Sequence, residues 1–248
     1  MEELDRWAVS RLGGLVEEVT EAYESYAFHR VVKAIHEFCT IQMSNFYLDV
    51  IKDRLYTSYP QSPHRRSAQT ALVEISKSLI RLMAPLVPVT AEEAWGSLYP
   101  AAQKSVHASA WPDSAALPRD KNLEEVWSRL FKLRDEAMKA LEKARQEGVI
   151  GDSLEAELEI AVSDKGLWDF LRTRQESVAS ACIVSSLRMN ETPGTGDPVS
   201  FTVRRSSGEK CQRCWMRLAS VGSSAEHPTL CLRCVENISK STSSAGKL

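Results

Sequence analysis

The sequence lacks the patterns that several large classes of protein require. In 248 residues, no apolar run approaches the roughly twenty residues that cross a bilayer, and no charged-then-apolar leader opens the chain. No glycine-rich phosphate loop is present, because Gly13 and Gly14 interrupt a helical pattern and the other glycines are scattered. No serine lies in a nucleophile-elbow pattern. We therefore expect no membrane partner and no catalytic residues in this chain.

The bulk composition is that of an ordinary globular protein. Hydrophobic residues make up 43% and charged residues 26% of a 27.7 kDa chain, which is long enough for more than one domain. Two of the six cysteines, Cys39 and Cys182, lie in apolar surroundings and are expected to be buried thiols. The six cysteines together suit a reducing compartment.

The other four cysteines form two pairs, Cys211 with Cys214 and Cys231 with Cys234, with sixteen residues between the pairs. Two tight turns that each present two thiolates can close a tetrahedral shell around Zn²⁺, and such a shell leaves no open position for substrate or water. A pair of disulfides is the alternative, but the doubled spacing favours zinc. The sequence therefore predicts one structural zinc ion.

Cations and an aromatic residue surround these cysteines. Arg213 and Trp215 flank Cys214, and Arg233 precedes Cys234. Guanidinium groups bind phosphate oxygens and an indole stacks on unpaired bases, so this segment suits nucleic acid. The alternatives are that Trp215 covers the core of the zinc module and that the arginines only increase solubility. His227 is expected to brace the module.

The charge distribution supports an anionic partner. The whole chain has a formal net charge of −2, but residues 201–248 contain eight Lys or Arg against three acidic residues. A second basic concentration lies between Lys52 and Arg81, where six Lys or Arg face two acidic residues. Runs of like charge are often only solvated surfaces. The charge distribution therefore agrees with an anionic partner but does not identify one by itself.

Periodicity divides the chain into a helical part and a mixed part. Apolar residues recur at helical spacing over 4–26, 28–56 and 63–82, and a capping box at Thr90 with Glu93 predicts a shorter helix through Leu98. A Pro-rich and Ser-rich linker at 100–118 follows, with Trp111 as its anchor. Another long helix, capped by Asn122, is expected to stop at Gly148.

The pattern beyond 150 alternates with a period of two at 156–162 and again at 199–203, which predicts two strands separated by short helices and an apolar run at 182–184. We therefore predict a mainly α protein with four parts. They are an antiparallel helical bundle with its linker (1–118), a small α/β domain (119–206), a C-terminal four-cysteine zinc knuckle (207–238) and a disordered Ser-rich tail (239–248).

Several motifs resemble a known family in the family's own order. The helical part resembles the anticodon-binding domain of class I aminoacyl-tRNA synthetases of the isoleucine, valine and leucine group, through DRW (5–7), FYLDVIKDRLY (46–56), MAP (83–85) and TAEEAW (90–95). The end of the chain resembles the zinc module of bacterial and organellar isoleucyl-tRNA synthetases, through KCQRCW (210–215) and HPTLCLRC (227–234). Among the isoleucine, valine and leucine enzymes, the resemblance of the zinc module indicates the isoleucine enzyme.

The resemblance implies recognition of tRNA(Ile) at its anticodon stem-loop by a monomeric fragment. The expected tRNA contacts are Arg54, Lys52, Arg213, Trp215 and Arg233. The family's two nucleotide-binding signatures, similar to H-I-G-H and K-M-S-K-S, do not occur. We therefore expect a chain that binds tRNA and cannot charge it, as the C-terminal part of a ligase that would use ATP.

Two other functions stay open at this point. Formamidopyrimidine-type DNA glycosylases have a zinc finger with the same cysteine spacing, but residue 2 here is Glu rather than the proline that such an enzyme uses. A zinc-stabilised protein-interaction module is the second alternative. For localisation, the Ser-rich spacer and tail favour the mitochondrial matrix, with the bacterial cytoplasm as the alternative.

Overall fold

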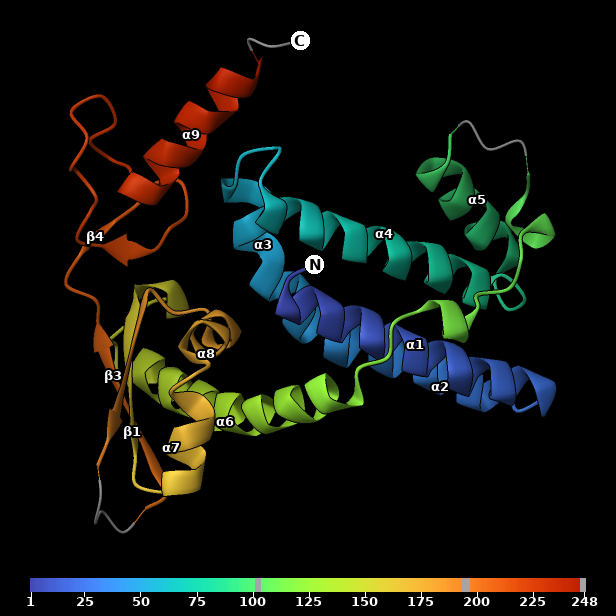
Figure 1. Ribbon diagram of the computed structural model, residues 1–248, viewed down its shortest axis with the longest axis horizontal. Helices are drawn as coiled ribbons and strands as arrows, with labels where there is room; N and C mark the ends of the chain where they lie inside the picture. The colour runs from blue at the N-terminus through green and yellow to red at the C-terminus, as the bar shows by residue number, and fades with distance from the viewer. Residues whose placement is uncertain (101–103, 193–196, 246–248) are drawn as a thin grey trace. The chain divides into compact units, whose positions relative to one another are not determined.

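The computed structural model describes residues 1–100, 104–192 and 197–245 and divides into two compact units. The first contains Met1–Leu55 and Gln61–Glu125, and the second contains Tyr56–Pro60 and Val126–Leu248. Most of the described residues are helical, as Figure 1 shows, which confirms the predicted fold class. In the described part of the chain, no helix is both long and apolar enough to span a bilayer. The predicted boundaries at 118, 206 and 238 stay predictions about which segments fold independently.

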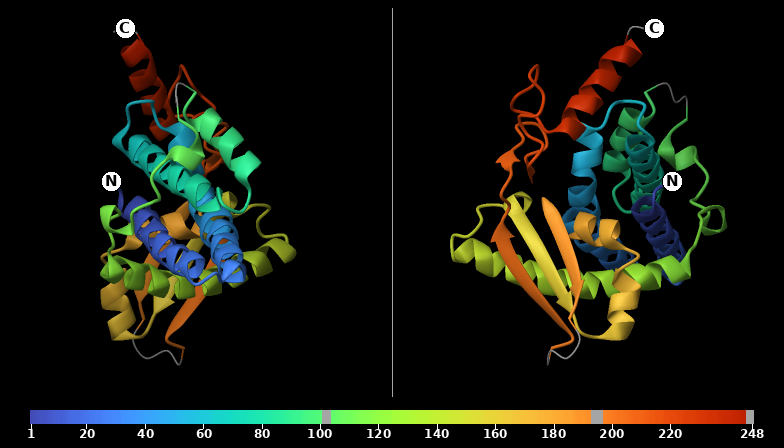
Figure 2. Two further views of the ribbon diagram at one scale, coloured as in Figure 1. Left: turned by 90° about the vertical axis from the view of Figure 1, so that its right-hand side faces the viewer. Right: turned by 60° about the vertical axis from the view of Figure 1, so that its left-hand side comes forward.

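The first unit is a helical bundle built around its first helix. Its helices are α1 (Glu3–Glu24), α2 (Phe28–Glu37), α3 (Leu48–Thr57, as far as Leu55), α4 (Pro63–Met83) and α5 (Pro88–Leu98). Helix α1 packs against α2 and α4, and the views of Figures 1 and 2 agree on this arrangement. The apolar stripe predicted for α1 is its buried face, which includes Leu4, Trp7, Leu12, Leu15 and Val19.

The helix predicted from Phe28 is continuous but changes its winding. Between α2 and α3 the segment Phe38–Tyr47 is a π-helix. A π-helix bonds residue i to i+5 and has wider turns than an α-helix. The wider turn keeps Phe38, Met43 and Tyr47, which are four or five positions apart, on the buried side. The 3.6-residue period therefore predicted the extent of this segment but not its geometry.

Two predicted helix starts are wrong. Helix α5 begins at Pro88, whose fixed φ suits the first helical position, and no side chain caps it. Glu92 instead accepts hydrogen bonds from the hydroxyl of Ser105 (2.7 Å) and the backbone N–H of Val106 (3.0 Å). Helix α6 (Lys121–Gln146) begins before Asn122, because Asp120 Oδ1 accepts the Leu123 N–H at 2.9 Å.

Short 3₁₀ turns at Val106–Ala108 and Ser114–Ala116 lie in the predicted linker, of which residues 101–103 are outside the described residues. The expected anchor is confirmed, because Trp111 Nε1 donates to Thr20 Oγ1 at 2.8 Å. Its ring also meets Tyr23 edge to face, with centroids 5.4 Å apart. The linker is thus attached to α1.

The second unit begins with most of α6 and contains a three-stranded sheet. Helix α6 ends at the predicted place, where Gly148 has φ 73° and the Val149 N–H donates to Ala144 O. After a 3₁₀ turn at Ser153–Glu155 come β1 (Ala156–Val162), α7 (Lys165–Leu171), α8 (Gln175–Cys182), β2 (Ser186–Glu191) and β3 (Val199–Arg205). Figure 2 shows the strands side by side, in the order β2-β1-β3.

The sheet agrees with the predicted alternation in β1 and β3, and β1 buries every second residue. Strand β1 pairs in parallel with β2 and antiparallel with β3, so that Leu158 lies opposite both Leu187 and Val203. Strand β2 was not predicted, because its mixed polar sequence has no clear period of two. The apolar run at 182–184 is not a strand, since Cys182 ends α8 and Ile183 caps it with φ 54°.

The end of the chain contains a short hairpin and a helix. Strands β4 (Glu209–Lys210) and β5 (Arg217–Leu218) pair antiparallel, and α9 spans Leu232–Ala245. Residues Ser239–Ala245, which were predicted to belong to a disordered tail, continue the helix. Hydroxyl groups there bond back to carbonyls one turn earlier, as Ser239 does to Val235 O at 3.1 Å. Residues 246–248 lie outside the described residues.

Candidate metal centre

The first cysteine pair lies in the turn of the β4–β5 hairpin. The ladder pairs Lys210 with Arg217, and beyond it the Cys211 N–H donates to Met216 O at 2.9 Å. The Trp215 N–H then donates to Cys211 O at 2.9 Å, with Trp215 in the left-handed region at φ 65°. This tight turn directs the sulfur atoms of Cys211 and Cys214 to the same side.

Close backbone approach at Gly208 closes the base of the hairpin. A Cβ atom at Gly208 would lie 2.3 Å from Leu218 C, 2.6 Å from Leu218 N and 2.7 Å from Ala219 N. These are backbone atoms, which no side-chain rotation can move away. A residue without a side chain is therefore required where the two strands meet.

The second cysteine pair is positioned by the start of α9. The Leu230 N–H donates to His227 O at 3.1 Å, and the Val235 N–H donates to Cys231 O at 3.1 Å. Cys231 thus precedes the helix and Cys234 lies in its first turn. The two halves are joined by the Gln212 N–H, which donates to Thr229 O at 3.1 Å.

The four sulfur atoms lie within 4.8 Å of one another and all four cysteines are buried. In a tetrahedral shell with Zn–S bonds of about 2.3 Å, neighbouring sulfur atoms are about 3.8 Å apart. The Sγ atoms of Cys214 and Cys231 are 3.8 Å apart, whereas a disulfide would require about 2.05 Å. The donor set therefore fits zinc, and Met216, Leu218, Val221 and Leu230 pack around it.

Polar contacts stabilise negative charge at part of this cluster. Burial acts to raise the pKa of Cys211, but the backbone N–H groups of Cys214, Cys231 and Arg213 outweigh it and lower that pKa to about 6. Burial raises the pKa of Cys214, and the Arg233 guanidinium beside its sulfur opposes this. The pKa of Cys234 is also raised, by burial and then by the neighbouring thiolates. A bound Zn²⁺ would hold all four as thiolates.

Buried serines attach the metal centre to the sheet. Ser206 donates its hydroxyl to Arg217 O at 3.0 Å, and its N–H donates to Glu155 O at 2.8 Å. The hydroxyl of Ser185 accepts the Arg217 N–H at 2.8 Å and donates to Leu154 O. The hairpin is thus held by hydrogen bonds at Arg217 in β5 and at Ser206, which precedes β4, within one compact unit.

The predicted binding residues of this module differ in their surroundings. Trp215 is 62% exposed and is not part of the packing around the sulfur atoms. Arg213 is half-buried, and its guanidinium donates to Thr57 O at 2.5 Å and to Tyr56 O at 3.5 Å. Arg233 is exposed and also lies 3.7 Å from Met216 Sδ.

The other two predicted contacts, Lys52 and Arg54, lie in the first unit. Lys52 is 64% exposed and pairs with Asp49 at 2.7 Å. The guanidinium of Arg54 is bound to the buried carboxylate of Asp5, at 2.8 and 3.0 Å. Arg54 and Arg213 therefore differ from the prediction in one respect, because their guanidinium groups bind oxygen atoms of the protein itself.

The segment Tyr56–Pro60, the end of α3 and the turn after it, belongs to the same unit as the metal centre and was not predicted to do so. The Tyr59 N–H donates to Asn237 Oδ1 at 2.9 Å, and the ammonium group of Lys240 lies 5.5 Å from the centroid of the Tyr59 ring. Tyr56 is 78% exposed. The one signal in the sequence was the FYLDVIKDRLY motif, which ends at Tyr56.

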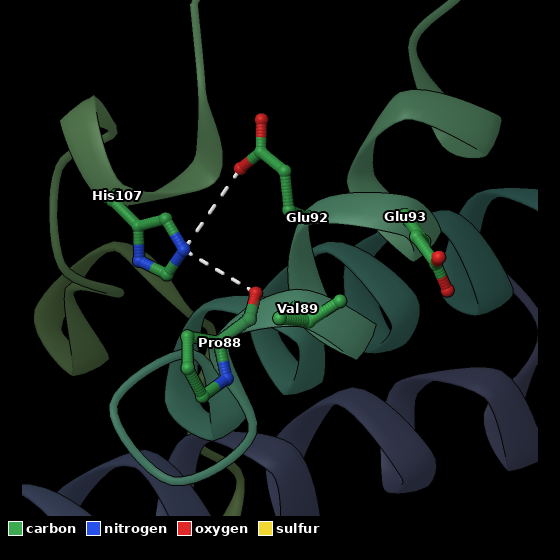
Figure 3. A pocket seen from close by; sticks show the side chains of 5 residues that line it. All are labelled: Pro88, Val89, Glu92, Glu93 and His107. Atoms are coloured by element: carbon green, nitrogen blue, oxygen red, sulfur yellow. Dashed lines mark hydrogen bonds and ion pairs between the residues drawn. The ribbon is translucent and has the colours of Figure 1, made fainter.

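A shallow pocket in the first unit offers less chemistry. It has a volume of about 330 Å³ and is lined by Pro88, Val89, Glu92, Glu93 and His107, as Figure 3 shows. His107 Nε2 lies 3.3 Å from Pro88 O and 4.0 Å from Glu92 Oε2. These contacts join the 3₁₀ turn at His107 to α5, which is a structural role.

Two known protein families match this chain, one over its helical part and one over its zinc module. The family described as the anticodon-binding domain of tRNA ligase matches residues 5–160, and the zinc finger found in FPG and IleRS matches residues 208–237. Similar proteins are the isoleucine–tRNA ligases of Syntrophotalea carbinolica (42% identical over 239 residues), Carboxydothermus hydrogenoformans (44% over 238) and Legionella pneumophila (42% over 244). These alignments cover 94%, 94% and 96% of this chain and 26% of each relative.

The chain thus spans about a quarter of the length of the curated relatives it matches. These relatives are bacterial, so the expected mitochondrial location has no support among them. The zinc-finger match and the clustered sulfur atoms agree on one structural zinc ion. Because the first match covers more than half of its residues, the chain belongs to the family of tRNA ligases that carry this anticodon-binding domain, with a zinc finger of the FPG and IleRS type.

Proposed function

We propose that this chain is the tRNA-recognition part of an isoleucine–tRNA ligase and binds the anticodon stem-loop of tRNA(Ile). The observation that supports this most strongly is the order of the two matches, an anticodon-binding domain at 5–160 followed by a zinc finger at 208–237. The zinc finger is shared with a DNA-repair family, so it leaves both functions open. The anticodon-binding match over the preceding residues favours tRNA.

The zinc module supplies a surface of suitable chemistry. Trp215 directly follows the buried Cys214 and its N–H is bonded to Cys211 O, so its backbone has little freedom, while its ring is mostly exposed. An unpaired base can stack on such a ring irrespective of sequence. Residues 201–248 carry eight basic and three acidic residues, which favours an anionic partner.

The predicted cations divide into residues that contact phosphates and residues that stabilise the fold. Lys52 and Arg233 are exposed, and we propose that they contact phosphates. Arg54 is engaged with Asp5, so its removal should act on the stability of the first unit rather than directly on tRNA.

Binding of a tRNA(Ile) anticodon stem-loop to the full chain tests this proposal. Affinity should fall steeply with salt, with a slope of roughly −0.7 per phosphate contact in single-stranded regions. Trp215→Ala should weaken binding by about 1–3 kcal/mol. Its zinc content and melting temperature should stay unchanged, because the ring lies outside the packed sulfur cluster.

An unrelated RNA duplex of equal length is the control ligand. Equal affinity for both RNAs, or salt-independent binding, would contradict recognition of the anticodon stem-loop. Loss of zinc from the Trp215→Ala variant would instead assign that ring to the core of the module. A footprint on full-length tRNA should show protection centred on the anticodon loop.

The relatives' whole activity extends beyond this chain. We propose that the complete ligase charges tRNA(Ile) with isoleucine using ATP, and that this chain by itself, as a monomer, gives no ATP–pyrophosphate exchange with isoleucine. Exchange by the purified chain would contradict this division of labour. The named relatives favour the bacterial cytoplasm as its location.

A further inference from the structure

We propose that Tyr56 is a second stacking residue in addition to Trp215, and that Arg213 is a positioning residue that holds the segment Tyr56–Pro60, the end of α3 and the turn after it, against the zinc module. This inference rests on the proposed RNA-binding function and changes its residue assignments. We take the ligand of each ring to be an unpaired RNA base.

The Arg213 guanidinium is bonded to the backbone at the end of α3. It extends from between two zinc-type ligands, Cys211 and Cys214, and donates to the carbonyl oxygens of Thr57 at 2.5 Å and Tyr56 at 3.5 Å. A guanidinium presents its donors in a rigid planar fork, so two neighbouring carbonyls define its orientation. The two N–H groups used in this way, one on Nη1 and one on Nη2, are not available for a phosphate, and we assign Arg213 a positioning role on this ground.

A second contact holds the same turn from α9. The Tyr59 N–H donates to Asn237 Oδ1 at 2.9 Å, and Asn237 in turn donates its amide to Arg233 O at 2.8 Å. The turn is therefore attached both to the cysteine hairpin and to the helix that carries Cys234. Because each attachment begins within the zinc module, a bound metal would stabilise the end of α3, from which the Tyr56 ring extends, and the turn that follows it.

The rings of Tyr56 and Trp215 are exposed, while hydrogen bonds hold the backbone from which each ring extends. Tyr56 is 78% exposed, and Trp215, two positions after Arg213, is 62% exposed. Exposed aromatic rings of fixed position lose little entropy on stacking with a base. The exposed cation Arg233 lies in the same compact unit and matches an RNA backbone in charge, whereas Lys240 pairs with Glu236 at 2.6 Å.

The test is a double-mutant cycle in the full chain, with a labelled tRNA(Ile) anticodon stem-loop as the probe. Tyr56→Ala should weaken binding about 5-fold to 150-fold, the range expected for the loss of one stacked base. Arg213→Ala should also weaken binding but leave the salt slope unchanged. Combining the two should weaken binding little beyond the larger single effect, because Arg213 acts through Tyr56.

Two further measurements separate positioning from general damage. Arg213→Ala should speed hydrogen exchange at the Tyr59 amide even without RNA, while Arg213→Lys, which keeps a donor for one carbonyl, should restore part of the affinity. Tyr26→Ala is the matched control for removing an exposed tyrosine, since Tyr26 is 81% exposed in the first unit. It should bind the stem-loop as the wild type does.

Each outcome supports or overturns a distinct statement. Additive losses with a salt slope lowered by about 0.7 would make Arg213 a direct phosphate contact and overturn its positioning role. Unchanged affinity in Tyr56→Ala would overturn the second stacking residue while leaving the proposed function standing. A wild-type chain that does not bind the stem-loop would overturn both. If Arg213→Ala loses zinc, Arg213→Lys and Tyr56→Ala carry the test.

Discussion

The guanidinium of Arg54 forms a two-pronged ion pair with Asp5, with Nη2 2.8 Å from Oδ1 and Nη1 3.0 Å from Oδ2. Asp5 is fully buried, and it also accepts hydrogen bonds from the hydroxyl groups of Tyr47, at 2.8 Å, and Ser67. The site joins α1, the end of the π-helical segment, α3 and α4. A basic residue expected to contact tRNA is therefore part of the framework of the first unit.

Removing Arg54 should destabilise this unit strongly. Arg54→Ala leaves the Asp5 charge buried without its cationic partner, which typically costs about 3–5 kcal/mol. Urea unfolding followed by circular dichroism measures the change. Arg66→Ala is the matched control, because Arg66 is an exposed arginine whose side chain bonds only to Gln69 among the contacts described, and should change stability by about 0.5 kcal/mol at most. Equal effects of the two variants would contradict a structural role for the ion pair.

Removing one thiolate should release the metal. Cys211→Ser should abolish tight zinc binding and unfold the region of about 207–238, because so short a segment has little core without its metal. Zinc content per chain and limited proteolysis report the two effects, and a chelator should reproduce them in the wild type. Cys39→Ser, a change at a thiol far along the sequence, should keep its zinc. A Cys211→Ser chain with one zinc and unchanged thermal unfolding would refute the site.

A methyl group at Gly208 should disturb the same module without touching a ligand. The added Cβ would overlap the backbone of Leu218 and Ala219, and overpacking of this kind typically costs about 1–3 kcal/mol. We expect Gly208→Ala to lower zinc affinity, measured by competition with a chromophoric chelator. Gly96→Ala is the control, since nothing lies within 4 Å of that position in α5. Retention of full affinity in Gly208→Ala would mean that the hairpin tolerates a wider separation.

Acid should lower the stability of the first unit by protonating Glu124. Burial acts to raise the pKa of this carboxyl group, but hydrogen bonds from Ser10 and Arg11 and the charges of Arg11 and Arg119 lower it below the ordinary value. A carboxyl group with a lowered folded-state pKa stabilises the fold above its unfolded pKa of about 4.3, and this contribution disappears as pH falls through the folded-state value.

Thermal unfolding of Glu124→Gln between pH 7 and pH 3 checks this sign. The variant should be less stable than the wild type near pH 7, and the difference should shrink as pH falls below about 4. Glu18→Gln, a change at an exposed carboxylate on α1, should show no such convergence. A difference that grows on acidification would mean that the carboxylate is not stabilised by its partners.

The sequence by itself determined the metal centre and the fold class. Thiolate chemistry and spacing specify a tetrahedral site whatever surrounds it, and the periods of α1 and β1 reflect which residues must leave water. The sequence did not determine the π-helical winding at Phe38–Tyr47 or the strand β2, because tertiary packing selects the first and pairing with β1 supports the second.

Only the tertiary structure decided what the arginines do. Sequence shows that Arg54 and Arg213 carry a positive charge, but a long flexible side chain can reach partners that are distant along the chain. Arg54 meets a carboxylate 49 positions away, and Arg213 meets a carbonyl 156 positions away. Because a guanidinium satisfies its donors wherever folding brings oxygen atoms together, its role is defined by the folded neighbours and not by local sequence.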